Sequence, residues 1–298
     1  MDAVELEVLV SAVNEDPAAL AEKMNLQTQA LIVNQCDQFA YREFSIGERR
    51  IRAFSMAERG VGLSRNTALM RAQGRICLFS DEDIVFAPGY EKTVLEAFDQ
   101  NPDADVITFN FKVDPSRATY YNTSRGRIRW YNYGRYPTYA VAARREALLR
   151  SGVSFSLLFG GGARYSNGED SLFLHDCLKR GLHLYAHTAQ IGEEVYRKST
   201  WFKGYDRKFF LDRGVLYHYL YGIMAGLFSL RFLLTHKSYV KGTVKGGPLR
   251  GRSTDGRVQS SGAGDGEDDA AAAKLTFQEA YRLMRQGIRE GKRRRERV

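Results

Sequence analysis

The chain has 298 residues, 44 Lys and Arg against 35 Asp and Glu, and a formal net charge of +9. At about 150 residues per domain, this length predicts one large domain or two modest ones. Hydrophobic residues make up 44 % and charged residues 27 %, which excludes wholesale disorder and a polytopic membrane protein. Three widely spaced cysteines, no CxxC pair and no secretion signal at Met1 favour a reducing, cytoplasmic compartment without a disulfide framework.

Most of the excess positive charge lies near the C-terminus. Residues 274–298 hold nine Lys and Arg against three Glu, a net charge of +6, and this leaves +3 for the rest of the chain. A nucleic-acid-binding fold is expected to spread basic residues over its whole surface. No nucleic-acid partner is therefore expected.

Apolar, β-branched runs alternate with helical patterns from residue 5 onward. Strands are predicted for residues 5–13, 30–33, 50–54, 75–79 and 104–111. Helices are predicted from Pro17, with Asp16 as N-cap, and over residues 62–72, 90–98 and 171–180. The alternation predicts an α/β fold with a mostly parallel sheet flanked by helices, in which ligands bind at the carboxyl ends of the strands.

The C-terminal third differs in composition. Residues 214–234 are apolar and aromatic and long enough to cross a bilayer at about 20 residues, but Arg231 and His218 favour a helix that lies on a membrane or packs on the domain. We therefore expect a domain over 1–213, an apolar helical region over 214–240, a flexible linker over 241–273 and a basic helical tail over 274–298. The oligomeric state is left open.

An acidic triplet follows the strand that is predicted to end at Phe79. It comprises Asp81, Glu82 and Asp83, after Ser80. Two carboxylates separated by one residue can both reach a hard divalent cation that keeps open positions for phosphate oxygens. Acidic triplets are also common in solvated turns, so the triplet alone leaves both interpretations open.

Four short motifs occur in a fixed order: E-V-L-V-S-A-V-N-E, G-L-S-R-N-x-A-L, L-F-S-D-E-D and G-E-D-S-L-F. Together, over residues 5–235, they resemble the family 2 glycosyltransferases, of the bacterial cell-surface polysaccharide type. The resemblance implies a GT-A-like, Rossmann-type sheet with a C-terminal helical extension. It also implies transfer of a sugar from a nucleotide-diphosphate donor, expected to be UDP-linked, to a hydroxyl of a glycan or lipid-linked acceptor.

The resemblance implies roles for individual residues. Asp81 and Asp83 match the DxD motif that holds Mn²⁺ or Mg²⁺ on the donor diphosphate, so Asp81 also counts as donor-binding. Arg65 matches an arginine near the nucleotide, and Asp170 matches the catalytic base of an inverting displacement. The loop that cradles the nucleobase corresponds to Ser11, Val13 and Asn14. An acid at the start of a helix is also favoured by the helix dipole, which is the alternative interpretation of Asp170.

The sequence also departs from the family pattern. Asn34 and Gln35 stand where acids usually follow the second strand, so base recognition is expected to rest on them, and Ser80 replaces a first Asp. No histidine clearly matches the late metal ligand, for which the candidates are His187, Glu193 and Glu194. Trp201 is a candidate neighbour of the diphosphate.

Three residues are expected on the acceptor side: Glu169 beside the base, Gly161 in a mobile glycine-rich wall, and Trp130 as a platform for a sugar face. A flexible loop for Gly161 and a core or rim position for Trp130 remain equally open.

Two other functions compete with the transferase. A sugar-phosphate nucleotidyltransferase usually has a Gly-rich, basic loop after its first strand, and residues 11–15 contain no Gly, Lys or Arg. A non-enzymatic basic protein that binds membranes or nucleic acid would rely on the C-terminal charge. For the transferase, that charge and residues 214–234 predict a peripheral location at the inner face of the plasma membrane.

Overall fold

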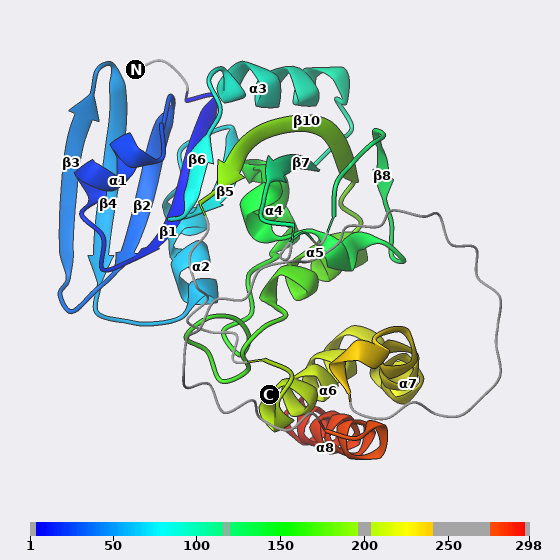
Figure 1. The fold of residues 1–298 in the computed structure, drawn as a ribbon. Helices are drawn as coiled ribbons and strands as arrows, with labels where there is room; N and C mark the ends of the chain where they lie inside the picture. The colour runs from blue at the N-terminus through cyan, green and yellow to red at the C-terminus, as the bar shows by residue number, and fades with distance from the viewer. Residues whose placement is uncertain (1–3, 116–117, 119, 196–203, 241–274, 296–298) are drawn as a thin grey trace, which may run out of the picture. The chain divides into compact units, whose positions relative to one another are not determined.

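The computed structural model describes residues 4–115, 118, 120–195, 204–240 and 275–295 (Figure 1). The chain forms two compact units, Met1–Phe202 and Lys203–Val298. The expected boundary after residue 213 falls inside a helix of the second unit. Residues 241–274, which include the expected linker, lie outside the described residues, as does Trp201.

The first unit is built on one mixed sheet. Among the described residues it has ten strands in the order β3-β4-β2-β1-β5-β9-β7-β10-β6, with β8 paired to β10. The strands are β1 (Leu6–Val13), β2 (Gln29–Gln35), β3 (Ala40–Ile46), β4 (Arg49–Met56), β5 (Ile76–Asp81), β6 (Ile84–Phe86), β7 (Val106–Lys112), β8 (Gly126–Ile128), β9 (Val141–Arg144) and β10 (Leu184–Glu194). The helices are α1 (Pro17–Lys23), α2 (Val61–Arg71), α3 (Tyr90–Gln100), α4 (Arg145–Ser151) and α5 (Glu169–Lys179), with short 3-10 helices η1 (Tyr133–Arg135) and η2 (Thr138–Ala140).

Only part of the sheet is parallel. Strands β4, β2, β1 and β5 run parallel to one another, as the sequence predicts, and β7 runs parallel to β10. Strands β3, β6, β8 and β9 pair antiparallel. These antiparallel strands are absent from the sequence-based prediction because they are short or, in β3, largely exposed.

The buried residues of β1 divide between two helical layers. Side chains on a strand alternate between the faces of the sheet, and Val8 and Val10 belong to the core that includes residues of α1 and α3. The opposite face carries Phe79. Its ring contacts Phe173 of α5 and also Phe155, which precedes that helix. This second face, which α2 also covers, bears the functional side chains.

The second unit is helical. It contains α6 (Arg207–Tyr221), η3 (Gly222–Met224), α7 (Ala225–Thr235), η4 (Lys237–Tyr239) and α8 (Phe277–Arg295). The apolar stretch that begins at Gly214 is divided, because α6 ends at Tyr221 and its C-cap, Gly222, has a positive φ of 54°. No helix among the described residues is both long and apolar enough to cross a membrane.

The basic C-terminal helix α8 packs into this unit. Phe210 of α6, Leu233 of α7 and Met284 of α8 share one buried cluster. A Cβ built on Gly287 would lie 2.1 Å from the carbonyl oxygen of Leu211, so the backbones of α6 and α8 are in direct contact. The helix expected over 274–298 therefore supplies core residues on one side and basic residues on the other.

Candidate active site

Four side chains from three elements converge at the carboxyl end of β5. Arg65 of α2 donates from Nη2 to Oδ1 of Asp81 at 3.0 Å and from Nη1 to Oδ1 of Asp170 at 3.0 Å. Its Nη1 also lies 3.4 Å from Oε1 of Glu169. The structure thus brings together the expected donor-side arginine, one acid of the DxD motif and both acids of the G-E-D-S-L-F motif.

Strand register and helix position explain this convergence. Asp81 lies at the end of β5, level with Ser11 of β1, and two residues after Phe79 on the same face. Arg65 lies in the second turn of α2, which covers that face, and its guanidinium also lies 5.5 Å from the ring centre of Phe155. Asp170 is in the first turn of α5, where the helix dipole stabilises its negative charge.

Among the described residues, the cluster has one cation, Arg65, for three carboxylates. Arg65 is buried, with 4 % of its side chain exposed. Burial disfavours its charged form, but attraction to Asp81, Asp170 and Glu169 outweighs burial and raises the pKa of Arg65 above its ordinary value. The Nε of Arg65 has no hydrogen-bond partner among the described residues, so its donor capacity is not exhausted.

Glu169 and Asp170 differ in their surroundings. Burial, followed by repulsion from Asp170, raises the pKa of Glu169 to about 7 although Arg65 opposes the shift. Asp170 has 31 % of its side chain exposed. Its Oδ1 accepts hydrogen bonds from Arg65 and from the hydroxyl of Thr138, and among the described residues no hydrogen bond is made to its Oδ2. An accessible carboxylate oxygen of this kind can accept a proton from a bound hydroxyl group.

The acidic turn after β5 is tied to two neighbouring strands. The carboxylate of Glu82 accepts from the backbone N–H of Val13 at 2.5 Å, and the carbonyl of Asp83 accepts from the N–H of Val195, just after β10, at 2.7 Å. No three His, Cys, Asp or Glu side chains form a metal cluster within the described ranges. Mg²⁺ commonly binds through one or two carboxylates, with phosphates and waters as the other ligands. Asp81 and Asp83 fit a cation that is held jointly with a diphosphate.

The predicted donor residues lie at the same edge of the sheet. Ser11 accepts a hydrogen bond from Ser64 of α2 at 2.9 Å. The side-chain amide of Asn34 makes two hydrogen bonds to the backbone of Glu15, and Gln35 donates to the carbonyls of Glu58 and Gly60. Asn34 and Gln35 are both buried, so their amides hold the loops around this edge.

Val13 and Asn14 complete the loop that follows β1. Val13 is partly exposed, and Asn14 has a left-handed backbone with a φ of 55°. The Oδ1 of Asn14 lies 3.4 Å from a guanidinium nitrogen of Arg59. The loop is therefore exposed at the carboxyl end of β1.

The glycine run of residues 160–162 packs against the start of α2. The carbonyl of Gly161 accepts from the N–H of Val61 at 2.9 Å. Gly160 has a φ of 103°, and a Cβ built on it would lie 2.6 Å from Cγ1 of Val61 and 2.8 Å from Cδ of Glu169. The run is therefore a close-packed wall beside the acidic pair, and its expected mobility stays a prediction.

Other predicted residues lie farther along the chain. Trp130 has 73 % of its surface exposed and contacts Tyr131 edge to face. Of the candidate third metal ligands, Glu193 pairs with Lys112 at 3.2 Å, and Glu194 lies beside Ile84 in the strand pairing that leads to Asp83.

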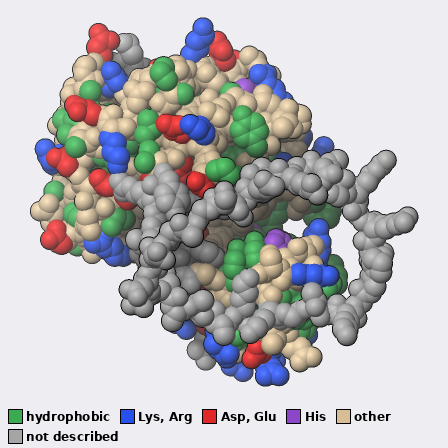
Figure 2. Space-filling model, in the orientation of Figure 1, with side chains coloured by type: hydrophobic (Ala, Val, Ile, Leu, Met, Phe, Trp, Pro, Cys, Tyr) green, Lys and Arg blue, Asp and Glu red, His purple; other side chains and the backbone are tan. Residues whose placement is uncertain are grey.

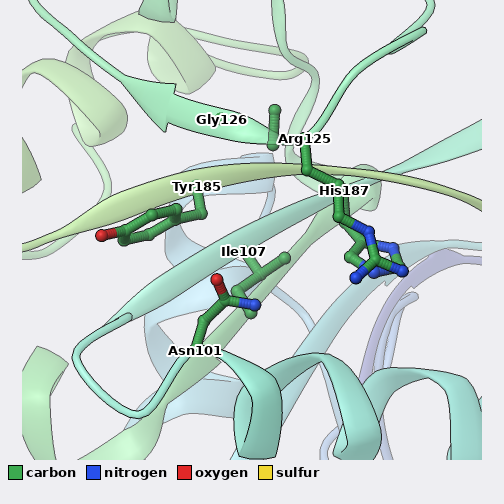
Figure 3. A pocket seen from close by; sticks show the side chains of 7 residues that line it. Asn101, Ile107, Arg125, Gly126, Tyr185 and His187 are labelled. Carbon is green, nitrogen blue, oxygen red and sulfur yellow. The ribbon is translucent and has the colours of Figure 1, made fainter.

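His187, the remaining candidate ligand, lies in a different pocket. That pocket is also lined by Asn101, Arg125 and Tyr185, and not by Asp81 or Asp83 (Figure 3). Burial, followed by the charge of Arg125, lowers the pKa of His187. The neighbouring arginine makes this an unfavourable place for a metal cation.

Part of the chain matches a known protein family. The family described as Glycosyl transferase family 2 matches residues 30–159. This match assigns a family 2 glycosyltransferase domain to those residues. The matched range includes Arg65, Asp81 and Thr138 but ends before Glu169. The family match therefore does not support the assignment of Glu169 and Asp170 to the site, which depends on the geometry. No curated protein matches the chain.

Solved structures match over most of the chain. S. aureus TarS, residues 1–349 in complex with UDP-GlcNAc, is 16 % identical with a TM-score of 0.55, over 79 % of this chain and 73 % of that one. The same fragment with UDP is 14 % identical with a TM-score of 0.52, over 79 % and 72 %. The mannosyltransferase PcManGT from Pyrobaculum calidifontis, with GDP-Man and Mn²⁺, is 17 % identical with a TM-score of 0.46, over 72 % and 62 %. The TarS structures show that the family 2 glycosyltransferase domain has the expected GT-A-like fold.

Thr138 is a site residue that the sequence analysis misses. It belongs to η2, in a segment rich in Tyr and Arg, and its hydroxyl binds the same Asp170 oxygen as Arg65. No motif in the sequence marks it, because its role depends on how η2 lies against the start of α5.

Proposed function

We propose that this chain is an inverting glycosyltransferase that uses a nucleotide-diphosphate sugar. The observation that carries the proposal is the Arg65 guanidinium that joins Asp81 to Asp170 at the carboxyl end of β5. This arrangement places a donor-side acid and a base candidate on either side of one buried cation. The TarS structures with UDP-GlcNAc and UDP share the fold and support a UDP-linked donor as the first to test.

The proposed reaction is a single displacement. The acceptor oxygen attacks the anomeric carbon, the bond from that carbon to the diphosphate breaks, and the nucleoside diphosphate leaves with the bonding electrons. The acceptor proton passes to Oδ2 of Asp170, while Thr138 and Arg65 hold Oδ1. Attack opposite the leaving group inverts the anomeric configuration.

Positive charge near the donor is required because the leaving diphosphate gains negative charge. Mn²⁺ or Mg²⁺ held by Asp81 and Asp83 would supply Lewis-acid stabilisation of that charge. Arg65 keeps Asp81 in place and adds a fixed positive charge within the site. The loop of Ser11, Val13 and Asn14, supported by Asn34 and Gln35, is proposed to hold the nucleoside.

A thermal-shift panel tests donor use. The chain is heated with UDP-glucose, UDP-GlcNAc, GDP-mannose and UDP, each with and without Mn²⁺. A ligand that binds only the folded state raises Tm according to its concentration over Kd. We expect a UDP compound with Mn²⁺ to give the largest rise, and no rise with any of these ligands would contradict the proposal.

A matched pair of variants tests the base. Asp170→Asn should keep the donor-induced rise in Tm and lose transfer to an acceptor, whereas Asp176→Asn should retain both. Asp176 lies on the same helix and has 48 % of its side chain exposed. Wild-type turnover in Asp170→Asn would show that another group accepts the proton.

We also propose that the second unit binds an anionic membrane surface, which suits a lipid-linked acceptor. Ile223, Leu227, Leu230 and Leu234 are exposed at helical spacing on η3 and α7. Exposed basic residues occupy the solvent side of α8, and Arg285 reaches to within 3.9 Å of a Cβ built on Gly226 at the start of α7. Apolar and basic groups in this combination favour a lipid interface with anionic headgroups.

Vesicle sedimentation tests the membrane proposal. The full chain should bind phosphatidylglycerol vesicles more strongly than phosphatidylcholine vesicles, and the binding should weaken with salt. Leu227→Asp with Leu230→Asp should abolish binding, whereas Met70→Asp, at an exposed apolar position of α2, should not. Equal binding by wild type and the double variant would contradict the proposal.

A further inference from the structure

The segment 120–139 has an unusual charge pattern. It contains four Arg and seven aromatic residues but no Asp or Glu. In the structure it forms β8, η1 and η2 of the first unit. This basic character is separate from the excess charge in the last 25 residues.

Two adjoining pockets are lined by this segment. The larger has a volume of about 390 Å³ and is lined by Arg127, Arg135, Asn132 and further Tyr, Thr, Ser and Asn residues. The smaller, of about 210 Å³, contains Arg125 and His187 (Figure 3). Both pockets include Gly126 and Ala186 in their lining, and among the described residues no acid lines either pocket.

Three of the arginines contact neutral side chains. Arg135 donates to the hydroxyl of Tyr136 at 2.9 Å, and Arg127 lies over the ring of Tyr185 at 5.8 Å. Arg125 donates to the side-chain carbonyl of Gln100 at 2.7 Å. Guanidinium groups in a pocket that no carboxylate lines provide strong hydrogen-bond donors for phosphate or carboxylate oxygens.

The same segment leads directly to the candidate base. Tyr136 lines the larger pocket, and Thr138, two residues later, donates to Asp170. Gly134 also lies beside α5, since a Cβ built on it would be 3.8 Å from the hydroxyl of Ser171. The extended step from Tyr136 to Thr138 spans about 7 Å, which is about the length of one sugar unit.

Exposed aromatic rings accompany the arginines. Trp130, Tyr131 and Tyr121 have 73 %, 67 % and 59 % of their surfaces exposed. Such amphipathic rings are favoured at binding surfaces because one face is apolar while the edge remains polar. They provide a platform for the sugars that flank an anionic group.

We propose that the larger pocket, which Arg127 and Arg135 line, binds an anionic group, phosphate or carboxylate, on the acceptor glycan. The acceptor chain then extends from Asp170 along η1, with its charged group between Arg127 and Arg135 and its sugars against the exposed rings. This inference rests on the proposed transferase function and adds to it the chemical class of the acceptor.

Binding of matched polymers tests the inference. Dextran phosphate, carboxymethyl dextran and neutral dextran of equal size are titrated against the full chain at two salt concentrations. We expect at least one anionic polymer to bind and neutral dextran to bind much more weakly. The stronger of the two anionic polymers identifies the group as phosphate or carboxylate.

Variants locate the site. Arg127→Gln and Arg135→Gln should each weaken binding of the anionic polymer about tenfold. Arg150→Gln, which removes an exposed arginine of α4, should leave binding unchanged. Circular dichroism checks that each variant is folded, and Arg127→Glu provides a second, stronger perturbation.

The outcomes separate this inference from the proposed function. If UDP with Mn²⁺ raises Tm in every variant but neutral dextran binds as well as the anionic polymers, the transferase proposal stands and the inference fails. Equal polymer binding by wild type and both arginine variants also overturns it. If no nucleotide ligand raises Tm, the transferase proposal itself fails.

Discussion

Arg65 and Asp170 are 105 residues apart in the sequence, and Nη1 of the first lies 3.0 Å from Oδ1 of the second. The same guanidinium holds Asp81 through its other terminal nitrogen. A buried arginine with its donors directed at two separate carboxylates fixes the distance between the two halves of the candidate site. This geometry makes the site sensitive to changes that keep charge but alter shape.

Arg65→Lys should therefore impair turnover while leaving the fold intact. A lysine keeps the positive charge but lacks the planar fork that reaches both Asp81 and Asp170. We expect kcat for sugar transfer to fall about 100-fold, measured with the donor that gives the largest thermal shift. The control is Arg71→Lys, at an exposed position of the same helix, and a similar loss in both variants would contradict a specific role for Arg65.

Thr138→Val should lower kcat about tenfold through the lost hydrogen bond to Asp170. Valine has nearly the shape of threonine, so the core around η2 should remain packed. Because Thr138 acts through Asp170, KM for the donor should not change. Thr138→Ser restores a hydroxyl and should recover most of the activity, and failure of this rescue would indicate that packing alone explains the effect.

Glu169 should make stability depend on pH. Its folded pKa of about 7 lies above the ordinary value of 4.5, so the folded state holds a proton that the unfolded state releases between these pH values. The free energy of unfolding should fall as pH rises from 4.5 to 7, by about 1–3 kcal/mol. Above pH 7 this contribution should be constant.

Melting curves of Glu169→Gln isolate that contribution. The Tm difference between wild type and Glu169→Gln should change across pH 5–7.5, because the glutamine does not titrate. Glu146→Gln, at an exposed position of α4, should show a nearly constant difference. A constant difference for Glu169→Gln as well would place its folded pKa near the ordinary value.

Gly287→Val should destabilise the second unit. Its Cβ would lie 2.1 Å from the carbonyl of Leu211, so α8 would have to move away from α6. We expect a loss of about 1–3 kcal/mol in the free energy of unfolding, measured by urea denaturation. Gly226→Ala is the control, because its Cβ would meet only the flexible end of Arg285 at 3.9 Å.

Charge distribution also depends on the fold. In Figure 2, acidic and basic side chains are interspersed over the face that is shown, in keeping with the nearly balanced charge of the chain before residue 274. The basic residues of 275–295 would be a solvated tail by composition alone. In the structure, Ala280, Leu283 and Met284 of the same helix are buried, because their spacing forms an apolar face that packs against α6 and α7.

The sequence alone determined the fold class and provided the candidate residues of the donor side. The apolar runs at β1, β2, β5 and β7 are recognisable without a structure, because strands buried on both faces are continuously apolar. The N-cap at Asp16 is also readable, since capping is a local interaction, and the structure confirms it. The acids after β5 and at the start of α5 stand in short sequence motifs, and the family resemblance implies their roles.

Only the tertiary structure decided which of these residues meet. The joining of Asp81 to Asp170 by Arg65, the hydrogen bond from Thr138 and the engagement of Asn34 and Gln35 by loop backbone all depend on long-range packing. The antiparallel strands β3 and β9 likewise depend on their neighbours for hydrogen bonds. Local patterns specify which segments become helix or strand, whereas contacts between distant segments arise only when the whole sheet and its helices bury their common core.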